Sequence, residues 1–402
     1  MSEEPGECSV RFNTVDRFLI VVVFGGGCAV ASVFQNIFLF YTLVSSRKYR
    51  QSHFLYFIFL SVCDITVSFC YIFLIAVDNL KDFVSSLTLT RFWWSYFIYV
   101  FTVCHVSMST SIFLLVAATF ERFLSQVGSR LLVFVENHRL AMAIGAVVMG
   151  CGLKAPIVFE IELIPNGNCT GQNAYVPELT SICENFLYGT VYKFYVRNVF
   201  TVFIPFLLLA AFNVRIVFQI RQRGHRANLF RFSHHRQVQS QARMATRMLV
   251  VVVSTYLVTN TLNVVLTAWE HIDMHSLLVD YQAFYMYMAD VVSVLAVLGC
   301  FSRLFIFVAF NQDVRDAVRA MLIGCCPLLS KLMQQSSDRS DGMNRRYSQF
   351  DKIALSIALN VRDSDQRMAR LAAANAQQLQ REQNSALLQS RIDTNGNIEI
   401  DC

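Results

Sequence analysis

Charged residues are scarce in this chain. Asp, Glu, Lys and Arg together make up 15% of its 402 residues, whereas hydrophobic residues make up 55%. Soluble globular domains carry about a quarter charged residues, because a surface in contact with water needs them. The low charge therefore excludes an ordinary soluble domain, and the mean hydropathy of +0.44 indicates a protein built into a membrane.

Other features that mark particular protein classes are also lacking. Internal repeats are not apparent, which argues against a transporter built from inverted halves. His234 and His235 have no Cys or His cluster near them, and no nucleophile stands with a general base, so no metal site, cofactor or enzyme activity is expected. Residues 1–17 lack the basic segment and cleavage site of a signal peptide, so the first hydrophobic segment is expected to be a signal anchor.

Long hydrophobic runs recur along the chain. A helix needs about 20 apolar residues to cross a bilayer, because no water is available there to hydrogen-bond its backbone. Seven runs meet this length, and the sequence thus predicts an all-α membrane protein, a bundle of seven transmembrane helices. The runs are Phe18–Val44, Phe54–Val77, Trp93–Phe120, Leu140–Phe159, Val196–Phe218, Met248–Trp269 and Phe284–Phe310.

Positive charge falls on one side of these segments. Arg47, Lys48 and Arg50 follow the first segment, and seven arginines with no acidic residue lie within 221–247, after the fifth. Cytoplasmic loops hold the excess of Lys and Arg, so we expect a multi-pass plasma-membrane protein with its N-terminus outside and its C-terminus in the cytoplasm. The glycosylation sequon at Asn168 then lies outside. The net charge of +6 follows from this topology, so no nucleic-acid partner is expected.

Several polar residues stand at characteristic places in the apolar segments. They are Asn36 in the first, Asp64 in the second, Ser111 and the tripeptide Glu121-Arg122-Phe123 in the third, and Pro205 in the fifth. In order and position these residues resemble the motifs of the rhodopsin-like G-protein-coupled receptors, over about residues 15–325. The resemblance implies a receptor that activates a heterotrimeric G protein, with Glu121, Arg122 and Phe123 as its cytoplasmic latch. A resting ion pair between Glu121 and Arg122 is expected.

The resemblance also implies roles for the chain after the seventh segment. Asn311–Arg315 resembles the start of the family's short eighth helix, and palmitoylation is expected at Cys325 and Cys326. The expected domains are an extracellular N-terminus at 1–17, the receptor domain at 18–323 and a disordered cytoplasmic tail at 324–402. Receptor kinases would phosphorylate the tail and so recruit arrestin. The candidate sites are Ser336, Ser337, Ser340 and Ser348.

Departures from the family's pattern narrow the ligand and the mechanism. Cys104 stands eighteen residues before Arg122, where amine receptors carry an aspartate, so a biogenic-amine ligand is not expected. Val297 stands where an opsin needs its Schiff-base lysine, which excludes an opsin. The sixth segment has Tyr256–Leu262 in place of the family's tryptophan and proline motif. We therefore expect a relay to Arg122 in which Tyr256 and Arg303 replace the usual residues.

Arg303 is the main departure in the seventh segment, where it stands in place of the family's Asn-Pro-x-x-Tyr motif. Our hypothesis is that Arg303 pairs with Asp64 and replaces the sodium ion that Asp64 and Ser111 would otherwise hold, because a buried cation needs a counter-charge. With Asn36, these residues would form a central polar switch. The alternative is that Arg303 extends toward the inner lipid headgroups.

The loop at about 162–191 is long and polar, which suits the covering of a peptide site. Three cysteine pairings stay open for this region: Cys169 with Cys183, Cys8 with one of them, or a displaced bridge to Cys104. The first is preferred, because the intervening loop is short enough to close at little entropic cost. Candidate ligand contacts at the outer helix ends are Cys104, His105, Lys154, Arg197, Glu270 and Asp290.

The sequence is thus interpreted as a receptor for an extracellular peptide, similar to nematode receptors for FMRFamide-like neuropeptides. Its expected partners are the peptide, a heterotrimeric G protein, arrestin, receptor kinases and membrane lipids. A chemosensory receptor for small molecules is the alternative within this class. A seven-helix channel or transporter is the alternative from another class, and it would need a polar pathway through the bundle.

Overall fold

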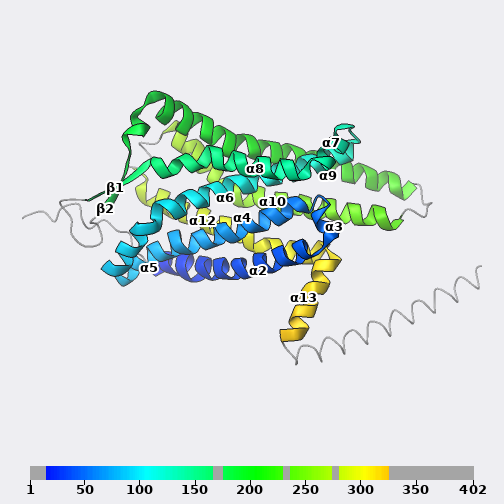
Figure 1. The fold of residues 1–402 in the computed structure, drawn as a ribbon, viewed down its shortest axis with the longest axis horizontal. Helices are drawn as coiled ribbons and strands as arrows, with labels where there is room; N and C mark the ends of the chain where they lie inside the picture. Colours follow the sequence, from blue (N-terminus) through cyan, green and yellow to red (C-terminus); the bar gives the residue numbers. More distant parts are fainter. Residues whose placement is uncertain (1–14, 166–174, 230–235, 274–279, 326–402) are drawn as a thin grey trace, which may run out of the picture. The chain divides into compact units, whose positions relative to one another are not determined.

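A computed structural model describes residues 15–165, 175–229, 236–273 and 280–325. Seven helices in this part of the chain are long and apolar enough to cross a membrane, which confirms the predicted bundle (Figure 1). These spans are Val15–Ser45, Leu55–Val84, Leu87–Val127, Arg139–Phe159, Val199–Gln222, Met244–Glu270 and Gln282–Phe310. The third span is longer than its hydrophobic run, because Arg91 and Arg122 interrupt the run of apolar residues but not the helix.

The first, second and fifth spans combine α-helix with π-helical turns. The elements of the seven spans are α1 (Val15–Phe18), η1 (Leu19–Gly25) and α2 (Gly26–Ser45); α4 (Leu55–Tyr71), η2 (Ile72–Ala76) and α5 (Val77–Val84); α6 (Leu87–Val127); α8 (Arg139–Lys154) and η3 (Ala155–Phe159); η7 (Val199–Phe203) and α9 (Ile204–Leu229); α10 (Arg236–Ile272); and α12 (Gln282–Phe310). The π-helical η7 lies just before Pro205, which has no N–H to donate to the preceding turn.

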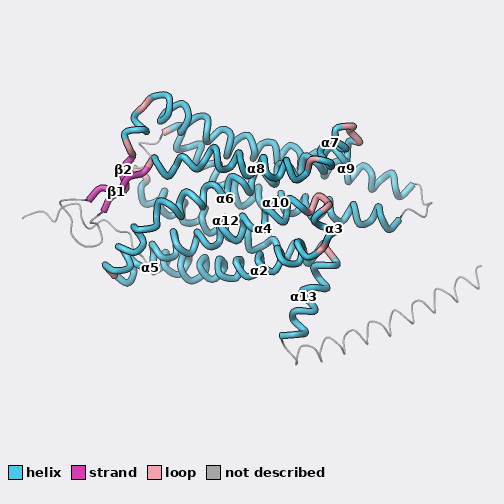
Figure 2. Tube along the Cα trace, in the orientation of Figure 1, coloured by secondary structure: helices cyan, strands magenta, loops and turns pink. Residues whose placement is uncertain are grey.

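The two ends of the bundle differ. At one end β1 (Ile161–Pro165) and β2 (Tyr175–Leu179) form an antiparallel hairpin, and Figure 2 shows the strands confined to this end. At the other end lie α3 (Arg47–Arg50) and α7 (Leu131–Asn137). We call these the hairpin end and the α7 end. That the α7 end faces the cytoplasm stays a prediction.

Apolar side chains fill the core and also cover the outside of the bundle. Phe34, Tyr41 and Val258 point outward and are 69%, 71% and 74% exposed. A soluble protein would not expose so many large apolar side chains, so this outer surface suits contact with lipid tails. The buried core includes Leu39, Leu60, Leu114, Val253 and Phe307.

Helix α6 runs through the middle of the bundle, where it packs against α4, α8, α9 and α10. Its contact with α8 is close at Gly150. A Cβ atom built on Gly150 would lie 2.2 Å from Oγ1 of Thr110 and 3.0 Å from the backbone N of Thr110. A larger side chain at position 150 would therefore push the two helices apart.

We expect Gly150→Ala to lower the midpoint temperature of unfolding of the chain purified in detergent. Overpacking of this kind costs about 1–3 kcal/mol, because backbone atoms must shift. Gly145→Ala on the same helix is the matched control, since its Cβ atom meets nothing within 4 Å and alanine favours a helix more than glycine does. Equal midpoints for the two variants would contradict the close contact.

The chain separates into two compact units, residues 1–318 and 319–402. Helix α13 (Gln312–Cys325) begins where the short eighth helix is predicted, and the boundary between the units falls within it. Cys325 is its last residue. The candidate palmitoylation residue Cys326 and the candidate phosphorylation sites Ser336, Ser337, Ser340 and Ser348 lie outside the described residues. All contacts described below belong to the first unit.

Candidate functional site

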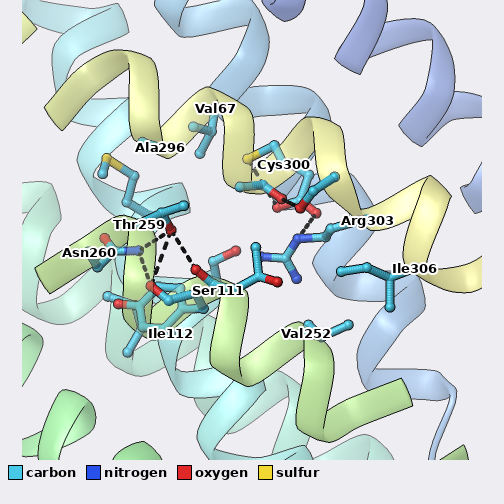
Figure 3. Close-up of a pocket in the computed structure, with 16 residues that line it drawn as sticks. Val67, Ser111, Ile112, Val252, Thr259, Asn260, Ala296, Cys300, Arg303 and Ile306 are labelled. Atoms are coloured by element: carbon cyan, nitrogen blue, oxygen red, sulfur yellow. Dashed lines mark hydrogen bonds and ion pairs between the residues drawn. The ribbon is translucent and has the colours of Figure 1, made fainter. Parts of the chain in front are cut away.

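An ion pair lies in the middle of the bundle. Arg303 on α12 places its Nε atom 2.7 Å from Oδ2 of Asp64 on α4 (Figure 3). The two residues are 7% and 1% exposed. The predicted pairing is thus confirmed, and the alternative in which Arg303 extends to the headgroups is wrong. Although the two atoms are close, they do not have hydrogen-bond geometry, so the attraction between the charges holds the pair.

Hydrogen bonds extend this pair across a third helix. The thiol of Cys300 donates to Oδ1 of Asp64, with 3.5 Å between the atoms. Asn36 on α2 donates from Nδ2 to the backbone oxygen of Cys300 at 3.2 Å and to that of Ser32 at 2.9 Å. Asn36, Asp64 and Arg303, which the sequence assigns to one central switch, are therefore linked across α2, α4 and α12.

A small cavity of about 50 Å³ borders the ion pair. Ser111, Tyr256 and Asn260 line it together with Asp64 and Arg303. Figure 3 shows the side chains of Ser111, Asn260 and Arg303, which come from α6, α10 and α12. Its volume admits a water molecule, which needs about 10–15 Å³ on this measure. The buried Nη1 atom of Arg303 has no hydrogen-bond partner among the described residues. Because the guanidinium already balances Asp64, a sodium ion is not needed here.

Glu121 is bound by Arg139 rather than by its neighbour Arg122. Nη2 of Arg139 donates to Oε1 of Glu121 at 2.8 Å, and Nε donates to both carboxylate oxygens at 3.1 Å. The expected Glu121–Arg122 ion pair is therefore wrong. Successive residues on a helix point about 100° apart, so Glu121 faces α8, which begins at Arg139, while Arg122 points elsewhere.

Arg139 also joins other parts of the α7 end. Its Nη2 atom donates to Glu136 of α7 at 3.1 Å, and its Nη1 atom donates to the backbone oxygen of Gln51 at 3.1 Å. Glu121 is 2% exposed, so its carboxylate has exchanged water for these charged donors. Phe123, the last residue of the predicted latch, stacks on Phe212 of α9 with 5.2 Å between ring centroids.

Arg122 lines a cavity of about 360 Å³ at the α7 end. Met248 of α10 and Phe310 of α12 form part of its walls. The Nε atom of Arg122 is buried and has no hydrogen-bond partner among the described residues. Glu136 is the one acidic residue that lines this cavity in the described part of the chain, and it is already bound to Arg139.

His53 adds an uncharged wall to the same cavity. Burial, together with the positive charges of Arg122 and Arg139, holds the pKa of His53 well below its usual range. The imidazole is therefore neutral at pH 7. Lys48 also lines the cavity, which thus carries an excess of positive charge and can bind carbonyl or carboxylate oxygens.

The candidate ligand contacts at the hairpin end have partners within the chain in several cases. Asp290 binds Arg17, with 2.5 Å between Oδ2 and Nε. Glu270 accepts a hydrogen bond from the hydroxyl of Tyr285 at 2.7 Å. Arg197 binds Glu160. The ring of His105 packs edge-on against that of Phe101, with 4.4 Å between the ring centroids. Lys154 is 8% exposed, and Cys104 forms no disulfide bond with another described residue.

The predicted glycosylation site and most of the predicted cysteine bridge lie outside the described residues. These residues are Cys8, Asn168 and Cys169. Cys183 has a free thiol here, and Lys193 donates to its sulfur at 3.5 Å. A bridge between Cys169 and Cys183 stays a prediction.

Sequence reasoning missed three charged residues that complete these sites: Arg17, Arg139 and Glu160. Each lies one residue outside a predicted hydrophobic run, where charges are usually assigned to loops. A signal was nonetheless present, since Asp290 and Arg197 lie inside predicted membrane segments. Buried charges of this kind need a partner of opposite sign nearby.

In comparisons with known proteins, no family model matches the chain, and no curated protein is similar enough to it to count as a relative.

Proposed function

We propose that this chain is a receptor of the rhodopsin-like type, which binds an extracellular ligand at the hairpin end and activates a heterotrimeric G protein at the α7 end. Seven apolar helices fit a membrane receptor, channel or transporter in general. One observation favours a receptor: Arg122 lines a cavity at a bundle end, and its buried Nε atom has no partner among the described residues. A guanidinium in that setting suits the binding of a protein segment that enters from the cytoplasm.

The cavity at Arg122 is where we expect a segment of the G protein to bind. Its walls come from α6, α10 and α12, which carry Arg122, Met248 and Phe310. We propose that activation widens this cavity by movement of one of its walls.

Helix α10 is the wall that connects this cavity to the centre of the bundle. Tyr256 on α10 borders the Asp64–Arg303 pair, and Met248, about two turns away on the same helix, lines the Arg122 cavity. A displacement of α10 would thus change both places together. The Glu121–Arg139 pair can stay intact during this step, because Arg122 has no bond to Glu121 that must first break.

The ligand is proposed to be a peptide, on the resemblance to neuropeptide receptors, with small molecules as the alternative. The test is to express the chain with a panel of G proteins and to apply amidated peptides and small molecules. We expect at least one ligand to evoke G-protein activation. Ligand-evoked current in cells without the corresponding G proteins would contradict the receptor and favour a channel.

A further inference from the structure

Positive charge exceeds negative charge at one buried place near the hairpin end. Lys154 ends α8, Lys193 lies in η6 (Phe186–Val196), and Arg197 follows η6. Glu160, 3% exposed, is the one acidic residue in the described part of the chain that forms ion pairs with this group. We call Lys154, Lys193, Arg197 and Glu160 the hairpin-end cation cluster. With one carboxylate for three cations, the cluster carries a net positive charge.

The single carboxylate of the cluster is already engaged by several donors. Oε1 of Glu160 accepts hydrogen bonds from Nη1 of Arg197 at 2.5 Å and from the hydroxyl of Tyr188 at 2.9 Å. Oε2 lies 3.9 Å from Nζ of Lys193. Glu160 therefore satisfies Arg197 in part and Lys193 weakly, and it has little capacity left for a third cation.

Lys154 is the cation of the cluster that Glu160 attracts only from beyond ion-pair distance. It is 8% exposed, and no hydrogen bond or ion pair joins it to another described residue. The buried Nε atom of Arg197, whose charge interacts with that of Lys154, also lacks an acceptor in the described part of the chain. A buried cation whose charge is only partly balanced is costly, and in membrane proteins such residues usually mark a functional site.

An open groove of about 690 Å³ lies beside the cluster. Its lining includes Tyr188 and Tyr192, whose rings lie 5.3 Å apart. The hydroxyl of Tyr188 reaches Glu160, and that of Tyr192 bonds the backbone oxygens of Gly152 and Leu153, directly before Lys154. The two tyrosines thus line the groove and also contact the cluster or the residues directly before it. The rest of the lining is Pro156, Ser181, Ile182, Asn185 and Leu187, which is partly apolar.

We propose that the hairpin-end cation cluster binds the carboxylate of a ligand whose apolar or aromatic body lies in the groove beside Tyr188 and Tyr192. Lys154 and the free Nε atom of Arg197 would bind the carboxylate, because both are charged donors without an acceptor of their own. This inference deepens the proposed receptor function, on which it rests, by naming a class of ligand. The carboxylate belongs to an organic acid or to a peptide, and the two sources call for separate arms in the test.

The test measures the unfolding midpoint of the full chain, purified in detergent, with arylalkyl carboxylates and with their uncharged amides. We expect carboxylates to raise the midpoint and the matching amides to leave it unchanged. In Lys154→Met the shift by carboxylates should disappear. The midpoint of ligand-free Lys154→Met should rise above that of the wild type, because an unpaired buried charge has been removed. Arg91→Met, which removes an exposed cation on α6 outside the cluster, should keep the wild-type response.

The proposed carboxylate site would be contradicted if amides stabilised the chain as strongly as carboxylates, or if no carboxylate stabilised it in either arm. It would also be contradicted if Lys154→Met kept the carboxylate response, or if the ligand-free midpoint of that variant were lower than that of the wild type. The last result would mean that Lys154 has a structural partner. Lys154→Met keeps an unbranched side chain that is one atom shorter, and its ligand-free midpoint is informative even if the carboxylate response is small.

A second arm uses short peptides that end either in a free carboxylate or in an amide. A shift by acid-ended peptides alone assigns the site to peptides, and a shift by small acids alone assigns it to organic acids. These measurements need no G protein, so they separate the two proposals. Carboxylate binding without nucleotide exchange on a G protein would contradict the proposed receptor function but support the carboxylate site. Nucleotide exchange driven only by uncharged ligands would support the receptor function but contradict the carboxylate site.

Discussion

Arg303→Gln is expected to destabilise the bundle more than any substitution of an exposed arginine. Asp64 is 1% exposed, and the change would leave its carboxylate buried without the guanidinium that lies 2.7 Å away. Breaking a buried ion pair by removing one partner costs about 3–5 kcal/mol. The measurement is the unfolding midpoint of the purified chain, with Arg130→Gln as the matched control, since Arg130 is exposed.

The double variant Asp64→Asn/Arg303→Gln separates charge from packing. We expect it to recover much of the stability that Arg303→Gln loses, because two neutral amide side chains can face each other without an unbalanced charge. Sodium should have no effect on the wild type, since Arg303 already balances Asp64. A sodium-dependent midpoint in the wild type, or an Arg303→Gln variant as stable as Arg130→Gln, would contradict the role of the pair.

The parts of the fold that the sequence predicts are those that the bilayer dictates. Each span must satisfy its backbone hydrogen bonds internally and must be apolar, so a hydrophobic run marks its position. The same constraint predicted the Asp64–Arg303 pair, because two opposite charges within apolar runs need each other. The ends of the spans were less predictable. Arg91 interrupts the apolar run of the third span, yet the helix extends to Leu87.

The partner of Glu121 could not be predicted from sequence proximity. Arg122 is adjacent in the chain but points in another direction, and Arg139 reaches Glu121 from the start of α8. That contact depends on how α6 and α8 pack, which Gly150 permits by bringing the two helices close. In the same way, the contact of Arg197 with Glu160 depends on where η6 lies. Neither packing arrangement is indicated by a hydrophobic periodicity or by a motif in the sequence.

Arg122→Ala is expected to reduce ligand-evoked G-protein activation by at least about tenfold. Hydrogen bonds to a charged group contribute about 1.5–3 kcal/mol, and the guanidinium of Arg122 offers several of them in its cavity. The stability of the variant should equal or exceed that of the wild type, because the buried Nε atom has no partner to lose among the described residues. Arg130→Ala, which removes an exposed arginine a few residues after α6 ends, is the matched control and should signal normally.

The most direct test of Arg122 as the contact for a G protein is the rate of GDP release from a purified G protein. The receptor would be placed in lipid nanodiscs, with the ligand that the cellular screen identifies. We predict faster release with the wild type and with Arg130→Ala, and release at the receptor-free rate with Arg122→Ala, although all three bind the ligand. Equal acceleration by Arg122→Ala and the wild type would contradict the proposed role of Arg122.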